Sequence, residues 1–411
     1  MAQATKAEPF RGWGLLGLST LAIALTLPGQ TIGVSSFADH LTSDLAISAT
    51  SLSTAYLIGT ISGSLAMPAI GRWIDRTGVR KTMVIITVAF CAAVAYMGTV
   101  RHIWMLTVGF IGIRMLGQGA LSLVGQTSIA LWFDQKRGLA FGLSMTASAG
   151  LMSLGPLALT LLIENFGWRW AWVITAICIF LILVPATLRW MEDRPESIGQ
   201  RPDGRPFSGS AADTSADHYT VKEAISTNAF WVLTGVMVVS SALITGVTFH
   251  HFALMEAAGL TTAEAAAVFV PQMVGTVTAG FLWAWLTDRV SGKFLLFSCQ
   301  ASLLGAHLSY SWVSPGLGAA LYSLLLGVNG GSIRALTSAL YPKWFGTENI
   351  GAIRGVATAF GVGASAIGPL IVALGFRATG DYVTLNYFLA LIPALAMLAS
   401  FVIKAPQKSG Q

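Results

Sequence analysis

Acidic side chains are missing from the long apolar stretches of this sequence. All 18 Asp and Glu residues fall in polar connections or at the ends of apolar stretches. Two arginines, Arg114 and Arg334, do lie inside such stretches. A cation in hydrocarbon is costly unless it lines a pathway or meets an opposite charge. Because no acidic partner is available there, we expect the negative charge to arrive with a small anionic molecule.

Other absences exclude whole classes of protein. The three cysteines, Cys91, Cys178 and Cys299, show neither a disulfide pattern nor the spacing of a metal site. The sequence has no phosphate-binding loop and no arrangement typical of a catalytic triad. Basic residues do not cluster as a nucleic-acid surface would require. We therefore expect no enzyme, no ATP-driven pump, no cofactor, no metal and no nucleic-acid partner.

Apolar residues are abundant instead. They make up 54% of the 411 residues, whereas charged residues make up only 10%. A soluble domain of this length could not bury so much apolar surface. The chain therefore predicts an all-α membrane protein with about twelve transmembrane helices of roughly 20 residues each. The predicted spans are 12–36, 49–70, 82–100, 103–131, 139–163, 170–189, 229–252, 265–286, 294–313, 316–341, 355–375 and 382–403.

Lysine and arginine are distributed unevenly between the two sides of these predicted spans. With the N-terminus inside, nineteen of the 24 fall in cytoplasmic segments. The outer loops contain only Arg101, Arg169 and Arg377. Positive residues concentrate on the cytoplasmic side of membrane proteins. The sequence thus predicts a multi-pass protein of the cell (inner) membrane with both termini in the cytoplasm.

The chain repeats itself at an offset near 213 residues. Asp75-Arg76 recurs as Asp288-Arg289, and Gly155-Pro156 recurs as Gly368-Pro369. Six spans per half is an even number, so the two halves have the same orientation and form two parallel six-helix halves. We expect residues 1–190 and 229–411 to form these halves, with 191–228 as a cytoplasmic linker. Parallel repeats place the substrate site between the halves, near the middle of the membrane.

A short motif between the second and third predicted spans carries a family resemblance. Residues 71–81 read GRWIDRTGVRK, which resembles the signature loop of the major facilitator superfamily. In that family the acid and arginines of this loop latch the cytoplasmic side shut when the transporter faces outward. The alternative is that these charges only fix the topology. The resemblance implies a cytoplasmic gate made of Asp75, Arg76, Arg80, Asp288 and Arg289.

A second resemblance is narrower. Residues 133–142 read FDQKRGLAFG, and an RPE sequence at 194–196 is followed by PDG at 202–204. These segments resemble the monocarboxylate-porter and oxalate–formate-exchanger branch of the superfamily. Members of that branch move small carboxylates, so the resemblance implies a small carboxylate substrate.

The two arginines have different positions relative to the membrane. Arg114 lies about eleven residues into its predicted span, or about 16 Å along a helix, and thus near the midplane. It opens the sequence RMLGQG, which resembles the fourth-span motif of the superfamily. Arg114 is an anion anchor, a proton-coupling residue, or a guanidinium satisfied by neutral groups. Arg334 aligns through the repeat with Ser122, so it is offset by about 12 Å and is a second substrate contact or part of the inner gate.

Neutral polar residues in the spans complete the predicted binding site. Spans one, four, seven and ten line the cavity in the superfamily, which favours side chains on those spans. This favours Gln30, Gln118, Gln126 and Asn329 as substrate contacts. Tyr56 on the second predicted span and Gln272 on the eighth are further candidates.

Two adjacent histidines end the seventh predicted span. His250 and His251 point about 100° apart on a helix, so at most one faces a given cavity. Histidine titrates near neutral pH and could carry a coupled proton. The alternative is an interfacial pair satisfied by headgroups or water. His250 and His251 are therefore candidates for proton coupling.

These observations favour a monomeric secondary transporter for a small organic anion, a mono- or dicarboxylate. It would work by alternating access, as proton symport or anion exchange, with the lipid bilayer, protons or a counter-anion as its other partners. The alternative is a proton-coupled efflux pump for lipophilic compounds, with Arg114 in the coupling role. A non-transporting membrane receptor is a third possibility, but no sensor domain is visible.

Overall fold

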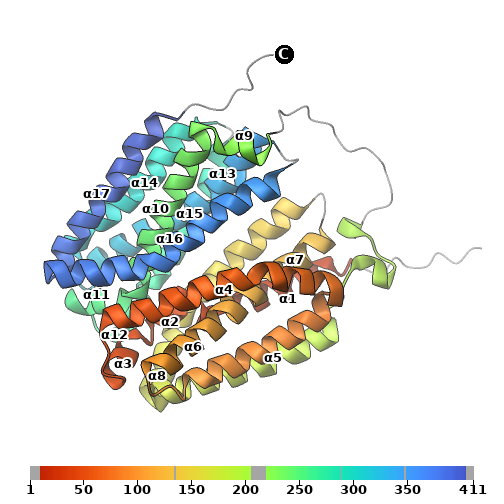
Figure 1. Cartoon of the computed structure of the whole chain (residues 1–411), viewed down its shortest axis with the longest axis horizontal. Helices are drawn as coiled ribbons and strands as arrows, with labels where there is room; N and C mark the ends of the chain where they lie inside the picture. The colour runs from red at the N-terminus through yellow and green to blue at the C-terminus, as the bar shows by residue number, and fades with distance from the viewer. Residues whose placement is uncertain (1–9, 134–135, 205–218, 288, 347–348, 404–411) are drawn as a thin grey trace, which may run out of the picture.

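The chain is all-helical wherever its structure is described. A computed structural model describes residues 10–133, 136–204, 219–287, 289–346 and 349–403 (Figure 1), and these contain no β-strand. We call residues 10–190 the N-terminal half and 228–403 the C-terminal half. The N-terminal half contains α1 (Gly12–Ala24), η1 (Leu27–Gly29), α2 (Thr31–Ser35), α3 (Ala38–Asp44), α4 (Ala49–Thr77), α5 (Val79–Met97), α6 (Ile103–Ile113), η2 (Arg114–Leu121), α7 (Ser122–Trp132) and α8 (Arg137–Trp190).

Short helices connect this half to the next. They are η3 (Pro195–Ile198), η4 (Pro202–Gly204) and α9 (Val221–Ile225). The C-terminal half contains α10 (Asn228–Phe249), α11 (His251–Ala257), α12 (Thr262–Ala267), α13 (Phe269–Leu286), α14 (Gly292–Ser309), η5 (Tyr310–Trp312), α15 (Leu317–Phe345), α16 (Ile350–Thr379) and α17 (Tyr382–Phe401).

Many of these helices have the length and composition of membrane spans. In the described part of the chain, seven are long and apolar enough to cross a bilayer, or eight if the bent pair α3 and α4 counts as one. The stretch Leu139–Trp190 counts as one of the seven, although two spans were predicted within it. Gly167, with φ +77° and ψ 156°, interrupts its helical geometry. The number of about twelve spans stays a prediction.

The first predicted span, 12–36, is broken rather than continuous. α1 ends at Ala24, and Gln30 has the extended backbone angles φ −92° and ψ 157° before α2 begins. Pro28 has no amide hydrogen and Gly29 has no side chain to stabilise a helix. The chain therefore presents main-chain groups where a regular helix would hide them.

The two halves meet at one end of the bundle. We call the end where α8 finishes and α10 begins the linker end, and the end that holds α3 and α11 the far end (Figure 1). Near the far end, Ile32 and Leu157 of the N-terminal half pack against an apolar cluster of the C-terminal half. The apolar cluster beneath α9 draws its described members from residues 219–403 alone. The described packing between the halves is thus concentrated at the far end.

Candidate functional site

Arg114 is buried within the N-terminal half and held by neutral groups. Its side chain is 2% exposed. Its Nε donates to Thr60 Oγ1 at 2.9 Å, and its Nη1 donates to the Gly29 carbonyl oxygen at 3.0 Å. The guanidinium carbon lies 4.5 Å from the centre of the Tyr56 ring, a cation–π distance. The break in the first span thus supplies one of the acceptors that this cation needs.

Close helix packing at Gly29 makes this contact possible. A Cβ atom at Gly29 would lie 2.3 Å from the Ile113 carbonyl oxygen. Only glycine lets the broken first span approach the helix that carries Arg114 so closely. Ile113, which precedes the arginine, and Gly29, which accepts its hydrogen bond, are therefore packed directly against each other.

The helix changes its geometry at Arg114. The eight residues Arg114–Leu121 form a π-helix between α6 and α7. Such segments are rare and are frequently found at functional sites. Gly117 faces the Phe90 ring and Gly119 faces the Met67 side chain, where a Cβ atom would approach to 2.4 Å and 2.5 Å. Glycines therefore let neighbouring helices contact the widened turn.

One nitrogen of the guanidinium is left without a partner. Arg114 Nη2 is buried and forms no hydrogen bond within the described residues. An unpaired buried donor costs about 1–3 kcal/mol, and more when the group is charged. Neither Arg114 nor Arg334 forms an ion pair with a carboxylate in the part of the chain that the structure describes. The site therefore has donor capacity for an added acceptor.

Tyr56 connects Arg114 to the C-terminal half. Its hydroxyl lies 2.6 Å from Thr31 Oγ1, and its ring is fully buried. The ring centre lies 4.6 Å from that of Phe249, the last residue of α10. Tyr56 thus contacts the arginine on one side and the opposite half on the other.

Arg334 has a different environment. It lies on α15, and its side chain is exposed. Its Nε donates to the Gly330 carbonyl oxygen of the preceding turn at 2.9 Å. The other guanidinium nitrogens remain available to water or a ligand because no further contact is described for them. The two predicted anchors therefore differ: Arg114 is enclosed, whereas Arg334 is accessible.

The predicted neutral polar residues differ in whether the structure describes a side-chain hydrogen bond for them. Gln30 is half-buried and donates to Thr26 Oγ1 at 2.9 Å. Asn329 is fully buried and donates to the Cys299 carbonyl oxygen at 2.7 Å, so its amide lies between α14 and α15. The remaining candidates are half-buried glutamines without a described side-chain hydrogen bond, namely Gln118, Gln126 and Gln272.

Both predicted coupling histidines lie at the junction of α10 and α11. His250 Nε2 is 3.0 Å from the Pro369 carbonyl oxygen and 3.4 Å from Ser53 Oγ of the opposite half. His251 Nε2 is 2.8 Å from the Ala265 carbonyl oxygen. A carbonyl oxygen only accepts, so each Nε2 carries a proton. Both residues are buried at the far end, where the halves meet.

The described hydrogen bonds of the predicted gate residues Arg80 and Arg289 lie within one half or the connection directly after it. The Arg80 main-chain N–H donates to Asp193 Oδ1 at 2.8 Å, and its Nη2 donates to the Leu188 carbonyl oxygen. Arg289 Nη1 donates to the Trp285 carbonyl oxygen at 2.9 Å, and Arg76 is exposed. Asp288 and the side chain of Asp75 lie outside what the structure describes.

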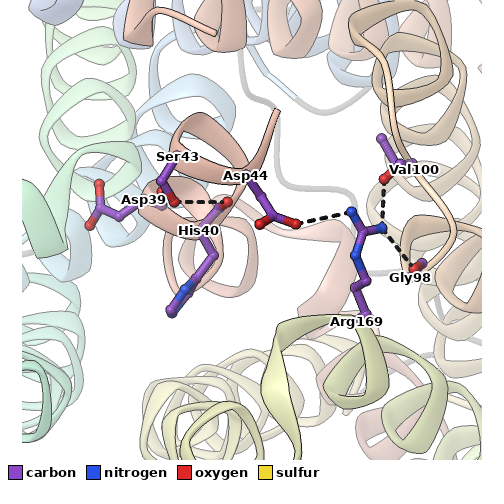
Figure 2. A network of polar contacts seen from close by, with 7 residues as sticks. All are labelled: Asp39, His40, Ser43, Asp44, Gly98, Val100 and Arg169. Carbon is purple, nitrogen blue, oxygen red and sulfur yellow. Dashed lines mark hydrogen bonds and ion pairs between the residues drawn. The ribbon is translucent and has the colours of Figure 1, made fainter. Parts of the chain in front are cut away.

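An ion pair at the far end was missed from the sequence. Figure 2 shows Arg169 Nη2 paired with Asp44 Oδ2 of α3 at 3.0 Å. Arg169 Nη1 also donates to the carbonyl oxygens of Val100 at 2.7 Å and Gly98 at 3.3 Å. The arginine therefore ties α3 to the loop between α5 and α6. Sequence reasoning used Arg169 only as a topology signal.

Asp39 is a second residue that the sequence did not single out. It lies on α3, which forms an angle of 118° with α4 and so leaves the direction of the span. Its carboxylate is directed away from Arg169, towards the C-terminal half (Figure 2). Partial burial, followed by the nearby charge of Glu256 on α11, raises the pKa of Asp39 to about 6. The sequence does not distinguish Asp39 from other acids, because it lies in a polar connection between two predicted spans.

The comparison with known sequences identifies a shared family pattern. Residues 16–369 match the sequence model of the Major Facilitator Superfamily. The chain is 24% identical over 311 residues to the MFS transporter asaE of Aspergillus flavus, which covers 71% of this chain and 66% of that protein. This chain therefore spans just under two thirds of the length of that relative.

Solved structures with the same fold include a bacterial homologue of the human lysosomal transporter Spinster. Its inward-facing, unoccupied form has a TM-score of 0.71 and 15% identity, over 96% of this chain and 98% of that chain. Its inward-facing, occupied form has a TM-score of 0.70 and 14% identity, over 98% of this chain and 100% of that chain. These similarities establish the fold alone.

Proposed function

Because the chain belongs to the major facilitator superfamily and is a multi-pass membrane transporter rather than an enzyme, we propose that it moves a small organic anion. The observation that carries this proposal is a buried guanidinium with an unpaired nitrogen and no carboxylate partner within the described residues. Carboxylates are natural acceptors for arginine because their two oxygens match two N–H groups. The substrate class is thus a mono- or dicarboxylate.

The two arginines have separate roles in this proposal. Arg334 is exposed and takes the anion first, whereas Arg114 is enclosed and binds it more deeply. The described packing between the halves lies at the far end, which supports a pathway open at the linker end. With the termini in the cytoplasm, this is an inward-facing state, the state named for the Spinster homologue. Alternating access over about twelve spans completes the cycle.

Coupling is by exchange with a second anion or by a proton. Two observations favour a proton route through the far end. His250 bridges Ser53 of one half and Pro369 of the other, and Asp39 carries a raised pKa beside the opposite half. Both groups lie where the halves must separate if the far end opens.

A proton-coupled efflux pump for lipophilic compounds is the second candidate. Arg114 is held by Gly29 and Thr60 of its own half, which also suits a residue that senses protonation rather than substrate. In that case anions would not compete for transport.

Uptake into proteoliposomes separates the two functions. A panel of labelled mono- and dicarboxylates is tested with and without internal anion, using the wild-type chain, Arg114→Lys and Arg334→Lys. Lysine keeps the charge but loses the bidentate geometry, so each variant should lose about tenfold or more in apparent anion affinity. Arg377→Lys, at an exposed site near a helix end, is the matched control.

The anion proposal fails if no carboxylate is taken up while lipophilic cations are expelled along a proton gradient. It also fails if both arginine variants transport a carboxylate as well as the Arg377→Lys control does.

A further inference from the structure

A groove that contains neither Arg114 nor Arg334 lies between α1 and the end of α8. Its volume is about 690 Å³, within the range typical of small-ligand sites. Gly14 and Gly17 lie one helical turn apart along it, and both are exposed. A Cβ atom at either glycine would meet nothing within 4 Å. The absence of two side chains therefore leaves this part of α1 open.

The groove is apolar along the helices and charged at its linker end. Leu18, Leu21 and Ala186 line its apolar part. Arg11, Arg189 and Glu192 line the same groove where α1 begins and α8 ends. The Arg11 main-chain N–H donates to Gln200 Oε1 at 3.0 Å, which fixes this end of α1 to the connecting segment. Apolar and charged groups are thus arranged in the order of a phospholipid tail and headgroup.

The charged side chains at the linker end of the groove determine which phospholipid headgroup would fit there. Two guanidinium groups suit a phosphate, because arginine binds phosphate oxygens with paired N–H donors. Glu192 would repel a headgroup with only negative charge, but it can accept hydrogen bonds from an ammonium group. A headgroup with one phosphate and one primary ammonium is complementary in charge to all three side chains.

We propose that this groove binds phosphatidylethanolamine. Arg11 and Arg189 bind the phosphate, Glu192 accepts from the ammonium, and an acyl chain lies over Gly14 and Gly17. The exposed Trp190 beside the groove suits the depth of the headgroups, where tryptophan is enriched. Arg114 instead contacts Thr60, Gly29 and Tyr56, so this lipid site is distinct from the proposed anion site.

Native mass spectrometry of the full chain in mild detergent tests the proposal. Phosphatidylethanolamine, phosphatidylglycerol, phosphatidylcholine and inorganic phosphate are each added, and the bound fraction is measured. The wild-type chain should retain phosphatidylethanolamine at least about tenfold more strongly than the other three, the ratio expected for one lost charged contact. Arg189→Ala should weaken retention of every phospholipid, and Glu192→Gln should remove the preference over phosphatidylglycerol.

Filling the groove provides the second test. Gly17→Leu should abolish retention, since leucine occupies the open part of the groove and is a better helix former than glycine. Gly142→Leu is the control, because Gly142 is also an exposed helical glycine with nothing within 4 Å of a Cβ atom.

Retention that is unchanged in Gly17→Leu would overturn the site. Equal retention of phosphatidylglycerol, with no effect of Glu192→Gln, would overturn the choice of headgroup. Displacement of the lipid by inorganic phosphate at similar concentration would show an ionic site without a lipid tail.

Discussion

At the scale of single residues, Arg169 illustrates why contacts matter more than charge counts. Its ion pair with Asp44 is partly exposed, with side-chain exposures of 38% and 49%, and such pairs contribute about 0.2–1 kcal/mol. The same arginine also donates to Val100 and Gly98 and stacks on Trp168 at 4.2 Å. Most of its contribution should therefore come from contacts other than the ion pair.

The corresponding prediction compares two substitutions by thermal unfolding in detergent. Asp44→Asn should lower stability by at most about 1 kcal/mol, because it removes only the exposed ion pair. Arg169→Ala should cost clearly more, since two carbonyl acceptors and a stacked ring also lose their partner. Equal effects of the two variants would show that the ion pair carries the whole contribution.

The sequence could identify a candidate functional residue whose chemical type is unusual for its surroundings. It could not identify hydrogen-bond partners that depend on how the helices pack. Arg114 stood out because a cation in an apolar stretch is rare, and the structure finds it buried. One of its two acceptors is a main-chain oxygen at Gly29, which no residue pattern reveals. Asn329 is a polar residue on the tenth predicted span, but its contact with Cys299 depends on helix rotation. Rotation is set by packing, which a single sequence does not contain.

At the scale of helices, Gly167 separates two predicted spans within α8. Its φ of +77° and ψ of 156° fall in a region that is essentially restricted to glycine. Gly167→Ala should therefore lower stability by about 1–3 kcal/mol. Gly142→Ala, in a regular part of the same helix with open space around it, should be neutral or slightly stabilising. Thermal unfolding of both variants provides the measurement, and equal melting temperatures would contradict the expectation.

The short helix α3 provides a pH-dependent prediction. Asp39 has a pKa of about 6 beside Glu256, against an ordinary value of 3.8. Protonation therefore favours the arrangement in which the far end is closed. This stabilisation is lost as pH rises through about 6, and it is fully present below the ordinary pKa. Distances between spin labels on α3 and α11 should shorten on acidification across this window.

Asp39→Asn should remove this pH dependence and hold the labels in the short-distance population. Asp44→Asn is the control, because Asp44 pairs with Arg169 rather than facing Glu256. A transition that persists unchanged in Asp39→Asn would assign the effect to another group, such as His40 on the same helix.

At the scale of the whole molecule, the distribution of contacts between the halves predicts which end admits water. Ser338 and Ser332 lie on α15, and only Ser338 is exposed. In a background without the native cysteines, Ser338→Cys should react with a membrane-impermeant thiol reagent added on the side proposed to be cytoplasmic. Ser332→Cys should react much more slowly, because its side chain is buried between helices. Equal rates for the two positions would contradict an opening at the linker end.

The fold was easier to predict from the sequence than its internal breaks. The length of the apolar stretches and the uneven distribution of positive charge can be read directly along the sequence. They therefore predict an all-helical membrane protein without knowledge of helix contacts. The break of the first span at Gln30 and the π-helix at Arg114 depend on contacts between helices distant in sequence. Proline and glycine indicated where a break was possible, but neither residue specified the partner.

The break at Gly29 determines which substitutions this site can tolerate as related sequences diverge. One of the two acceptors for Arg114 is a peptide oxygen, which every amino acid carries, so substitution of neighbouring side chains need not remove it. What must persist is the path of the chain, set by Pro28 and by a residue at position 29 small enough to approach Ile113. A relative could therefore replace Gln30 or Thr31 and keep this acceptor, whereas a continuous first helix would remove it and leave Thr60 as the acceptor.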